Sequence, residues 1–199
     1  LRRNIHGDGN TALGCEALYT NLFGTNNVAI GYQALYSDST GVENTAIGNW
    51  ALHNNVEGRN NVAIGNNSLS SNNTGNYNTA VGYGALRTNT IGDHNTALGR
   101  LSLRDNTTGT RNTAVGSAAL VLNTVGTNNA SFGTDSLCAN TIGRDNTAIG
   151  SAALKNNTTG IQNVAVGVGA LYINSVGSNN VSIGWQSLLC NTASNNTAV

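Results

Sequence analysis

The stretch NTAVGYGALRTNTIGDH, residues 78–94, is one unit of a repeat that runs through the whole chain. NVAIGNNSLSSNNTGNY precedes it and NTALGRLSLRDNTTGTR follows it, each displaced by seventeen residues. The asparagine that opens each unit recurs at this spacing from Asn10 to Asn180, and we number the repeat positions 1 to 17 from it. A fixed period of this length is typical of repeat architectures in which each unit stacks on the next.

The pattern within one unit reads N-[TV]-A-[IVLF]-G-x-x-[AS]-L-x-x-N-x-x-G-x-x, with few exceptions. Side chains at positions 2 and 4 share one face of a strand, and the β-branched residues there favour extended backbone. Glycine at positions 5 and 15 marks bends. The unit is too short for a strand plus a helix, and its apolar residues lack a 3.6-residue period. We therefore predict two short strands and two turns per unit.

Identical units of fixed length predict an all-β fold, a parallel β-solenoid (β-roll) of 17-residue coils in which equivalent residues stack about 4.8 Å apart. Residues 1–199 would form a single solenoid segment of 11 to 12 coils, cut in mid-repeat at both ends. No glycine stands between Ala193 and Ser194, so the last spacing is sixteen residues and we expect that coil to turn differently. The structural ladder of the quoted unit comprises Asn78, Val81, Gly82, Leu86, Asn89 and Gly92.

Positions 3 and 8 carry small residues, alanine or serine, in every unit. If the bulky residues at positions 4 and 9 fill the coil, positions 3 and 8 face outward, yet they do not vary as position 10 does. A constant outward surface of small residues indicates the close approach of another copy of the rod. The alternative is a coil that is itself narrow at these positions. The candidate subunit contacts are Ala80, Ala85, Ala114, Ala119, Ala148 and Ala153.

The NTAVG, NVAIG and NVSIG segments resemble the head repeats of the YadA-like trimeric autotransporter adhesins over nearly the whole chain. Repeats of this form also resemble the shafts of some phage and virus tail fibres. The resemblance implies a left-handed β-roll, a homotrimer around one axis and a surface-exposed adhesive fibre. The repeat here is a few residues longer than those head repeats, and we expect the turn around position 12 to be enlarged, as at Asn89 and Asn106. By the same analogy, coil interiors would be filled by Val28, Ile30, Val62 and Ile64.

Composition and charge argue against several classes of function. The formal net charge is zero and only 9% of residues are charged, which gives no basic surface for nucleic acid or anionic lipid. No apolar run approaches the roughly 20 residues that cross a bilayer. The acidic residues scatter over the repeat positions, and no two occupy one position in adjacent units, so no glycosidase-like carboxylate pair is evident. The three histidines, His6, His53 and His94, stand at three different positions. We therefore predict no catalytic, metal or cofactor site.

Two further residue types have unremarkable interpretations. Cys15, Cys138 and Cys190 stand at three different positions, and we interpret them as buried or idle thiols rather than interchain disulfides. A chain with thirty-five asparagines also generates N-x-[ST] sequences without any glycan. Such by-products are expected at Asn72, Asn106, Asn157 and Asn180.

Tyr19, Tyr32 and Tyr36 lie close together in the sequence, near the start of the chain, and form a candidate ligand patch. The leading hypothesis for function is a rigid, extracellular, homotrimeric fibre that presents or forms a region binding a host-cell or environmental surface. A virion tail-fibre shaft is the first alternative. A monomeric solenoid with an ice-binding or glycan-binding face is the second, and threonines at position 13, from Thr90 to Thr158, would suit ice. A tailspike-type enzyme is the third.

Overall fold

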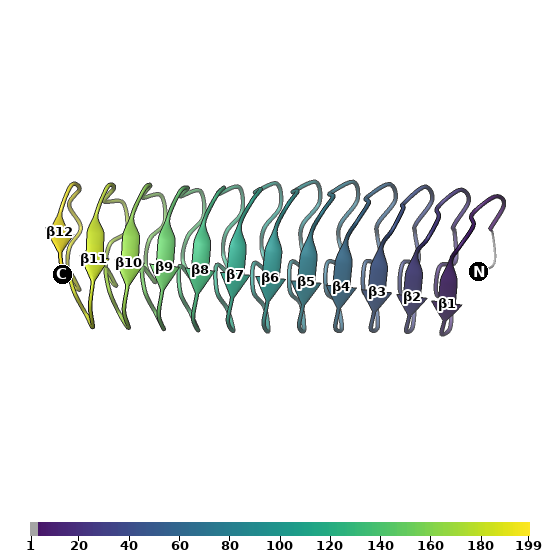
Figure 1. Cartoon of the computed structure of the whole chain (residues 1–199), viewed down its shortest axis with the longest axis horizontal. Helices are drawn as coiled ribbons and strands as arrows, with labels where there is room; N and C mark the ends of the chain where they lie inside the picture. The colour runs from purple at the N-terminus through teal and green to yellow at the C-terminus, as the bar shows by residue number, and fades with distance from the viewer. Residues whose placement is uncertain (1–3) are drawn as a thin grey trace.

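The computed structural model describes residues 4–199, and residues 1–3 of the predicted solenoid segment lie outside the described residues. The chain winds into a parallel β-solenoid with one twelve-stranded sheet, whose strands follow one another in sequence order from β1 at one end to β12 at the other (Figure 1). No helix occurs among residues 4–199. The strands are Thr11–Leu13 (β1), Val28–Ile30 (β2), Thr45–Ile47 (β3), Val62–Ile64 (β4), Thr79–Val81 (β5), Thr96–Leu98 (β6), Thr113–Val115 (β7), Ala130–Phe132 (β8), Thr147–Ile149 (β9), Val164–Val166 (β10), Val181–Ile183 (β11) and Thr197–Ala198 (β12).

Neighbouring strands are parallel, and each pairs equivalent residues of successive units. Thr79 pairs with Thr96, for example, seventeen residues further on. β11 and β12 keep this pairing although they are sixteen residues apart, as Val181 pairs with Thr197. The missing glycine is absorbed in the turn, where Asn191 donates its amide to the carbonyl of Ala193 at 2.9 Å. The irregular last coil predicted from the sequence is therefore confirmed.

Only one of the two predicted strands forms in each coil. The segment around position 9 is a turn, because its leucine adopts a left-handed backbone, with φ of 50° at both Leu86 and Leu103. Left-handed φ is incompatible with a β-strand. Backbone hydrogen bonds still join the coils here, since Leu86 N–H donates to the Ser102 carbonyl at 3.0 Å and Leu103 N–H to the Ala119 carbonyl at 3.0 Å. This side of the rod is a stack of turns rather than a second sheet.

The coil interior contains one large apolar side chain per unit, the leucine at position 9, beside the small residues at positions 3 and 8. In the quoted unit Ala80, Ala85 and Leu86 are fully buried. Because strand side chains alternate, positions 2 and 4 then point outward. Ile64 at position 4 remains 38% exposed. The predicted orientation is therefore wrong, and the narrow-coil alternative explains why positions 3 and 8 stay small.

The reversed orientation of the strand changes the place of two groups of residues. The candidate subunit contacts all lie inside the coil of a single chain with no exposed surface, so they are not available to a second chain: Ala80, Ala85, Ala114, Ala119, Ala148 and Ala153. The residues expected in the interior by analogy lie on the outer side of the sheet, partly or largely exposed: Val28, Ile30, Val62 and Ile64. Side chains of their size do not fit inside, because buried asparagines share that space with the leucine.

Two ladders of buried asparagines, at positions 1 and 12, run through the rod. At position 1, Asn95 donates its backbone N–H and its Nδ2 to Asn78 Oδ1 at 3.0 and 3.2 Å. At position 12, Asn106 Nδ2 donates to Asn89 Oδ1 at 2.8 Å. The Gly109 carbonyl accepts from both Asn95 and Asn106, at 2.8 and 3.0 Å, and so ties the two ladders together. Hydrogen bonding of this kind is what makes buried amides tolerable.

The six residues proposed as the structural ladder all occupy stacked positions. Asn78 and Asn89 are fully buried and both donate to the Gly92 carbonyl, at 2.8 and 2.9 Å. Leu86 is in the apolar core. Val81 pairs in register with residues of the adjacent strands but points outward. Gly82, with φ of 133°, stacks against the glycine of the next coil.

Candidate functional site

The largest candidate site is the outer side of the sheet, formed by the side chains at positions 2 and 4 and called the sheet face below. Position 2 carries threonine, valine or alanine, and no charged residue stands at either position in strands β1–β12. Ile149 and Phe132 are 43% and 40% exposed. Position 4 is occupied by Leu13, Ile30, Ile47, Ile64, Val81, Leu98, Val115, Phe132, Ile149, Val166 and Ile183. An exposed row of bulky apolar side chains makes this face a candidate interaction site.

The sheet face presents side chains only. Strands β2–β11 are each paired on both sides, so their backbone N–H and C=O groups are directed along the rod to the neighbouring coils. A partner on this face therefore gains contact with apolar side chains and threonine hydroxyls rather than main-chain hydrogen bonds. Sequence reasoning found the constancy of position 4 but assigned these side chains to the interior, because a constant bulky residue looks the same in either place.

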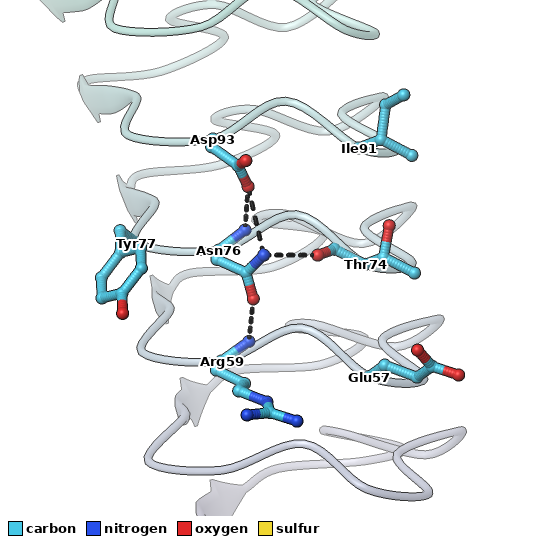
Figure 2. Close-up of a pocket in the computed structure, with 7 residues that line it drawn as sticks. All are labelled: Glu57, Arg59, Thr74, Asn76, Tyr77, Ile91 and Asp93. Carbon is cyan, nitrogen blue, oxygen red and sulfur yellow. Dashed lines mark hydrogen bonds between the residues drawn. The ribbon is translucent and has the colours of Figure 1, made fainter.

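A second candidate is a shallow groove of about 540 Å³ on another side of the rod (Figure 2). Position 14 supplies one row of side chains and position 16 the other, while Tyr77 lies beyond the second row. Its lining residues are Glu57, Arg59, Thr74, Asn76, Tyr77, Ile91 and Asp93. The groove combines both signs of charge with one aromatic and one aliphatic side chain.

The polar groups along the second row are bonded to one another (Figure 2). Asn76 Oδ1 accepts the backbone N–H of Arg59 at 2.9 Å, and Asp93 Oδ1 accepts the backbone N–H of Asn76 at 2.6 Å. Asn76 Nδ2 donates to the Thr74 carbonyl at 2.9 Å. These bonds satisfy backbone groups that face along the rod, which is a structural role. Glu57 and Asp93 belong to coils two units apart, or roughly 10 Å along the axis, which is wide even for an inverting carboxylate pair.

The tyrosines predicted as a ligand patch belong to two separate groups of contacting rings. Tyr19 stacks on Tyr36 with ring centroids 5.0 Å apart, and Tyr36 stacks on His53 at 5.2 Å. Tyr32 instead meets Trp50 edge to face at 6.0 Å. Sequence reasoning missed His53 and Trp50 as ring partners of these tyrosines. The sequence does contain a signal for His53. It lies seventeen residues after Tyr36, and residues at this spacing stack on one another in the solenoid.

The Trp50 ring is joined to side chains of the two preceding coils by hydrogen bonds. Trp50 Nε1 donates to Gln33 Oε1 at 2.8 Å, and Gln33 Nε2 donates to Glu16 Oε2 at 2.6 Å. The rings of Tyr19, Tyr36 and His53 are nearly parallel, so each covers a face of its neighbour. Nothing in this arrangement selects a particular ligand, and binding at the tyrosines stays a prediction.

Reactive side chains are isolated from one another. Cys15, Cys138 and Cys190 are free thiols. Burial raises the pKa of the Cys138 thiol and nearby Asp135 raises it further, so the thiolate is disfavoured. Lys155 bridges to Asp135 at 3.1 Å from the next coil. Within residues 4–199, no group of three or more histidine, cysteine or carboxylate side chains is placed to hold a metal ion.

The four N-x-[ST] asparagines belong to the buried ladders. Asn72, Asn106 and Asn157 stand at position 12 and Asn180 at position 1, and all four are fully buried. Each amide nitrogen donates to the preceding asparagine of its ladder, as Asn72 does to Asn55 at 2.8 Å. An amide engaged in this way is not available for attachment of a glycan.

No protein-family model matches the chain, and neither a curated protein nor a solved structure shows significant similarity to it. Within the part of the chain that the structure describes, no helix is long and apolar enough to cross a membrane.

Proposed function

We propose that the chain is a rigid segment of an extracellular adhesive fibre, in which copies of the rod associate side by side through the sheet face. The observation that carries the proposal is a face that keeps a bulky apolar residue at position 4 of strands β1–β11 and has no charged residue in any strand, although a single chain leaves much of it in water. Position 10, by contrast, carries tyrosine, histidine, arginine and lysine in different coils. Residues that face solvent are free to vary in polarity and charge from coil to coil, so a constant residue type indicates that another molecule covers the face.

A second copy of the chain is the occupant that the geometry favours. Both copies carry the same residue spacing of about 4.8 Å per coil, so two sheet faces match along their whole length. Eleven strands of three residues and one of two give a face roughly 50 Å long and 10 Å wide, or about 500 Å² per partner. Two such faces bury about 1,000 Å², the lower limit for a specific interface. The absence of charge removes the desolvation cost that a polar face would have.

The number of chains and the setting come from the resemblance of the repeat to the YadA-like head repeats. That resemblance implies a homotrimer, with the sheet faces turned towards a common axis, a left-handed coil and an extracellular location. In such a fibre the variable positions, including the tyrosine cluster, face outward and are free to meet a host-cell or environmental surface. A virion tail-fibre shaft would use the same rod and the same association. The function is mechanical in both cases, and the proposal assigns no catalysis.

The test is the solution mass of the chain, by light scattering over a dilution series, for two matched double variants. Ile64→Lys with Ile149→Lys places two charges on the sheet face. Ile91→Lys with Ile142→Lys makes the same change at position 14, where both side chains are 53% exposed. We expect the parent and the position 14 variant to be trimers, and the sheet-face variant to associate at least about 100-fold more weakly, since buried like charges oppose contact.

A parent chain that stays monomeric throughout the dilution series would contradict the proposal, as would equal association of the two variants. A monomer would leave the sheet face open to water, and thermal hysteresis would then test the ice-binding alternative. The position 13 row is already poorly suited to ice. Thr107 and Thr124 donate their hydroxyl protons to the next coil's carbonyl, both at 3.0 Å.

A further inference from the structure

The position 12 ladder has one direction. From Asn174 back to Asn72, each asparagine donates its Nδ2 to the Oδ1 of the asparagine one coil earlier, as Asn89 does to Asn72 at 2.9 Å. The same Nδ2 also donates to the glycine carbonyl three residues on, as Asn89 does to Gly92 at 2.9 Å. Each member therefore presents an acceptor to the following coil and a donor to the preceding one.

Asp38 is the single exception in this ladder, and it is fully buried. Its Oδ1 accepts Asn55 Nδ2 at 2.8 Å, as an asparagine Oδ1 would. Its Oδ2 stands where every other member has an amide nitrogen. The one hydrogen bond it receives is long, 3.4 Å from Asn27 Nδ2. A carboxylate thus occupies a place where the ladder needs a donor.

Asn21, the ladder member one coil before Asp38, lacks the donor that an asparagine at position 38 would supply. Asn21 Oδ1 is buried and has no hydrogen-bond partner in the structure. Asn21 otherwise behaves as a normal member, since its Nδ2 donates to Asn4 Oδ1 at 2.8 Å and to the Gly24 carbonyl at 3.1 Å. A buried acceptor without a donor is costly. One proton on Asp38 would supply that donor.

We propose that Asp38 is held as a neutral carboxylic acid whose Oδ2 hydroxyl donates to Asn21 Oδ1, and that its ionisation opens the junction between these two coils. The junction is then a pH-sensitive element within a ladder whose regular junctions, from Asn55 to Asn174, are bridged by asparagine amides. Asn174 Oδ1 is also unpaired, because Asn191 in the irregular last coil donates its amide to the Ala193 carbonyl instead. The proton moves between Asp38 Oδ2 and water, and no other group changes its bonding state. This inference does not depend on association through the sheet face.

The electrostatic surroundings agree with the geometry. Burial raises the pKa of Asp38 to about 7, against the opposing effect of the hydrogen bonds from Asn55 and from the Gly41 backbone. The groups that face the carboxyl from its own coil and from both adjacent coils are Asn21, Asn27, Asn55 and Gly41, none of which is charged or titratable. No neighbouring charge is present among them to hold the carboxyl ionised.

The sign of the effect follows from the raised pKa. The folded state binds the proton more tightly than the unfolded chain, whose aspartate has its ordinary pKa of 3.8. The stabilisation is therefore complete below about pH 4, declines as the pH rises, and is lost above about pH 7. A rise from 3.8 to about 7 corresponds to a change of up to about a thousandfold in the equilibrium constant for closing the junction.

Two variants of the whole chain test the proposal in opposite directions. Asp38→Asn restores the amide found in the other coils, so it should fold and should lose the pH response. Asn89→Asp places a second such acid in the middle of the ladder, beside the unchanged Asp38, and should have a larger pH response than the parent. The measurement is guanidinium denaturation of the parent and both variants at pH 5 and pH 8.5. We expect the parent and Asn89→Asp to lose stability at the higher pH relative to Asp38→Asn, with the larger loss in Asn89→Asp.

The protonation state is measured directly by carbon NMR of the parent chain with labelled aspartate carboxyls. One resonance, absent from Asp38→Asn, should titrate near pH 7. Titration of that resonance near pH 4 would overturn the proposal. An identical pH response of the parent and Asp38→Asn would also overturn it, because the response would then belong to other groups.

Discussion

Replacing Gly167 with alanine is expected to break the stack of coils and to lower the free energy of unfolding by about 3–5 kcal/mol. Gly167 stands at position 5 with φ of 133°, a conformation that costs other residues about 1–3 kcal/mol. A Cβ there would also lie 2.6 Å from the carbonyl carbon of Gly184 in the next coil, and relieving such a clash costs about as much again. Circular dichroism during guanidinium denaturation measures the loss.

The matched control lies two residues further along the same coil. Gly169 also has positive φ, 66°, but in the left-handed region that Ala118 and Ala152 adopt at the same repeat position. A Cβ at Gly169 would meet only Gln186 Cγ at 3.4 Å and Leu189 Cδ1 at 3.9 Å. We expect Gly169→Ala to cost less than about 1 kcal/mol. Equal stability of the two variants would contradict the close approach of successive coils at position 5.

Replacing Asn112 with leucine is expected to cost about 3–5 kcal/mol although the two side chains are similar in size. Asn112 Oδ1 accepts both the backbone N–H and the Nδ2 of Asn129, each at 3.1 Å. Leucine removes that acceptor and leaves two donors of Asn129 buried without their partner. Each such group costs about 1–3 kcal/mol. The free energy of unfolding from guanidinium denaturation is again the measurement.

Asn73→Leu is the control for this second variant. Asn73 is exposed and stands at position 13, where another coil carries Leu22. The change in stability there should lie within about 0.5 kcal/mol. A small loss in both variants would mean that the position 1 ladder contributes little to stability, and that the leucine core alone keeps the coils in register.

The sequence predicts the solenoid and its period because identical units at a fixed spacing leave few other folds. It does not predict which face of the strand points inward. An alternating Thr-Ala-Ile segment fits either orientation, and the usual rule that bulky residues lie inside gives the wrong one here. The deciding fact is that Asn78 and Asn89 occupy the interior beside Leu86, which leaves room only for alanine or serine. A polar residue type gives no indication of its burial until its partners are known.

The second predicted strand fails for a similar reason. Leucine rarely adopts left-handed backbone, so nothing in the sequence indicates that Leu86 has φ of 50°. The sheet face was missed as an interaction surface because its residues had been assigned to the core. Asp38 was visible as the one departure from asparagine at position 12, yet its significance depends on the unpaired Asn21 Oδ1, which is a property of the folded chain.

The asparagine ladders also make the rod electrically directional. In both ladders the later coil donates to the earlier one, so the amide dipoles of successive units add along the axis as peptide dipoles add in a helix. Any cut between two regular coils exposes amide donors on one surface and amide oxygens on the other. Two rods of this kind can therefore join end to end in one relative sense only, because the reverse arrangement would bring donors to donors or acceptors to acceptors.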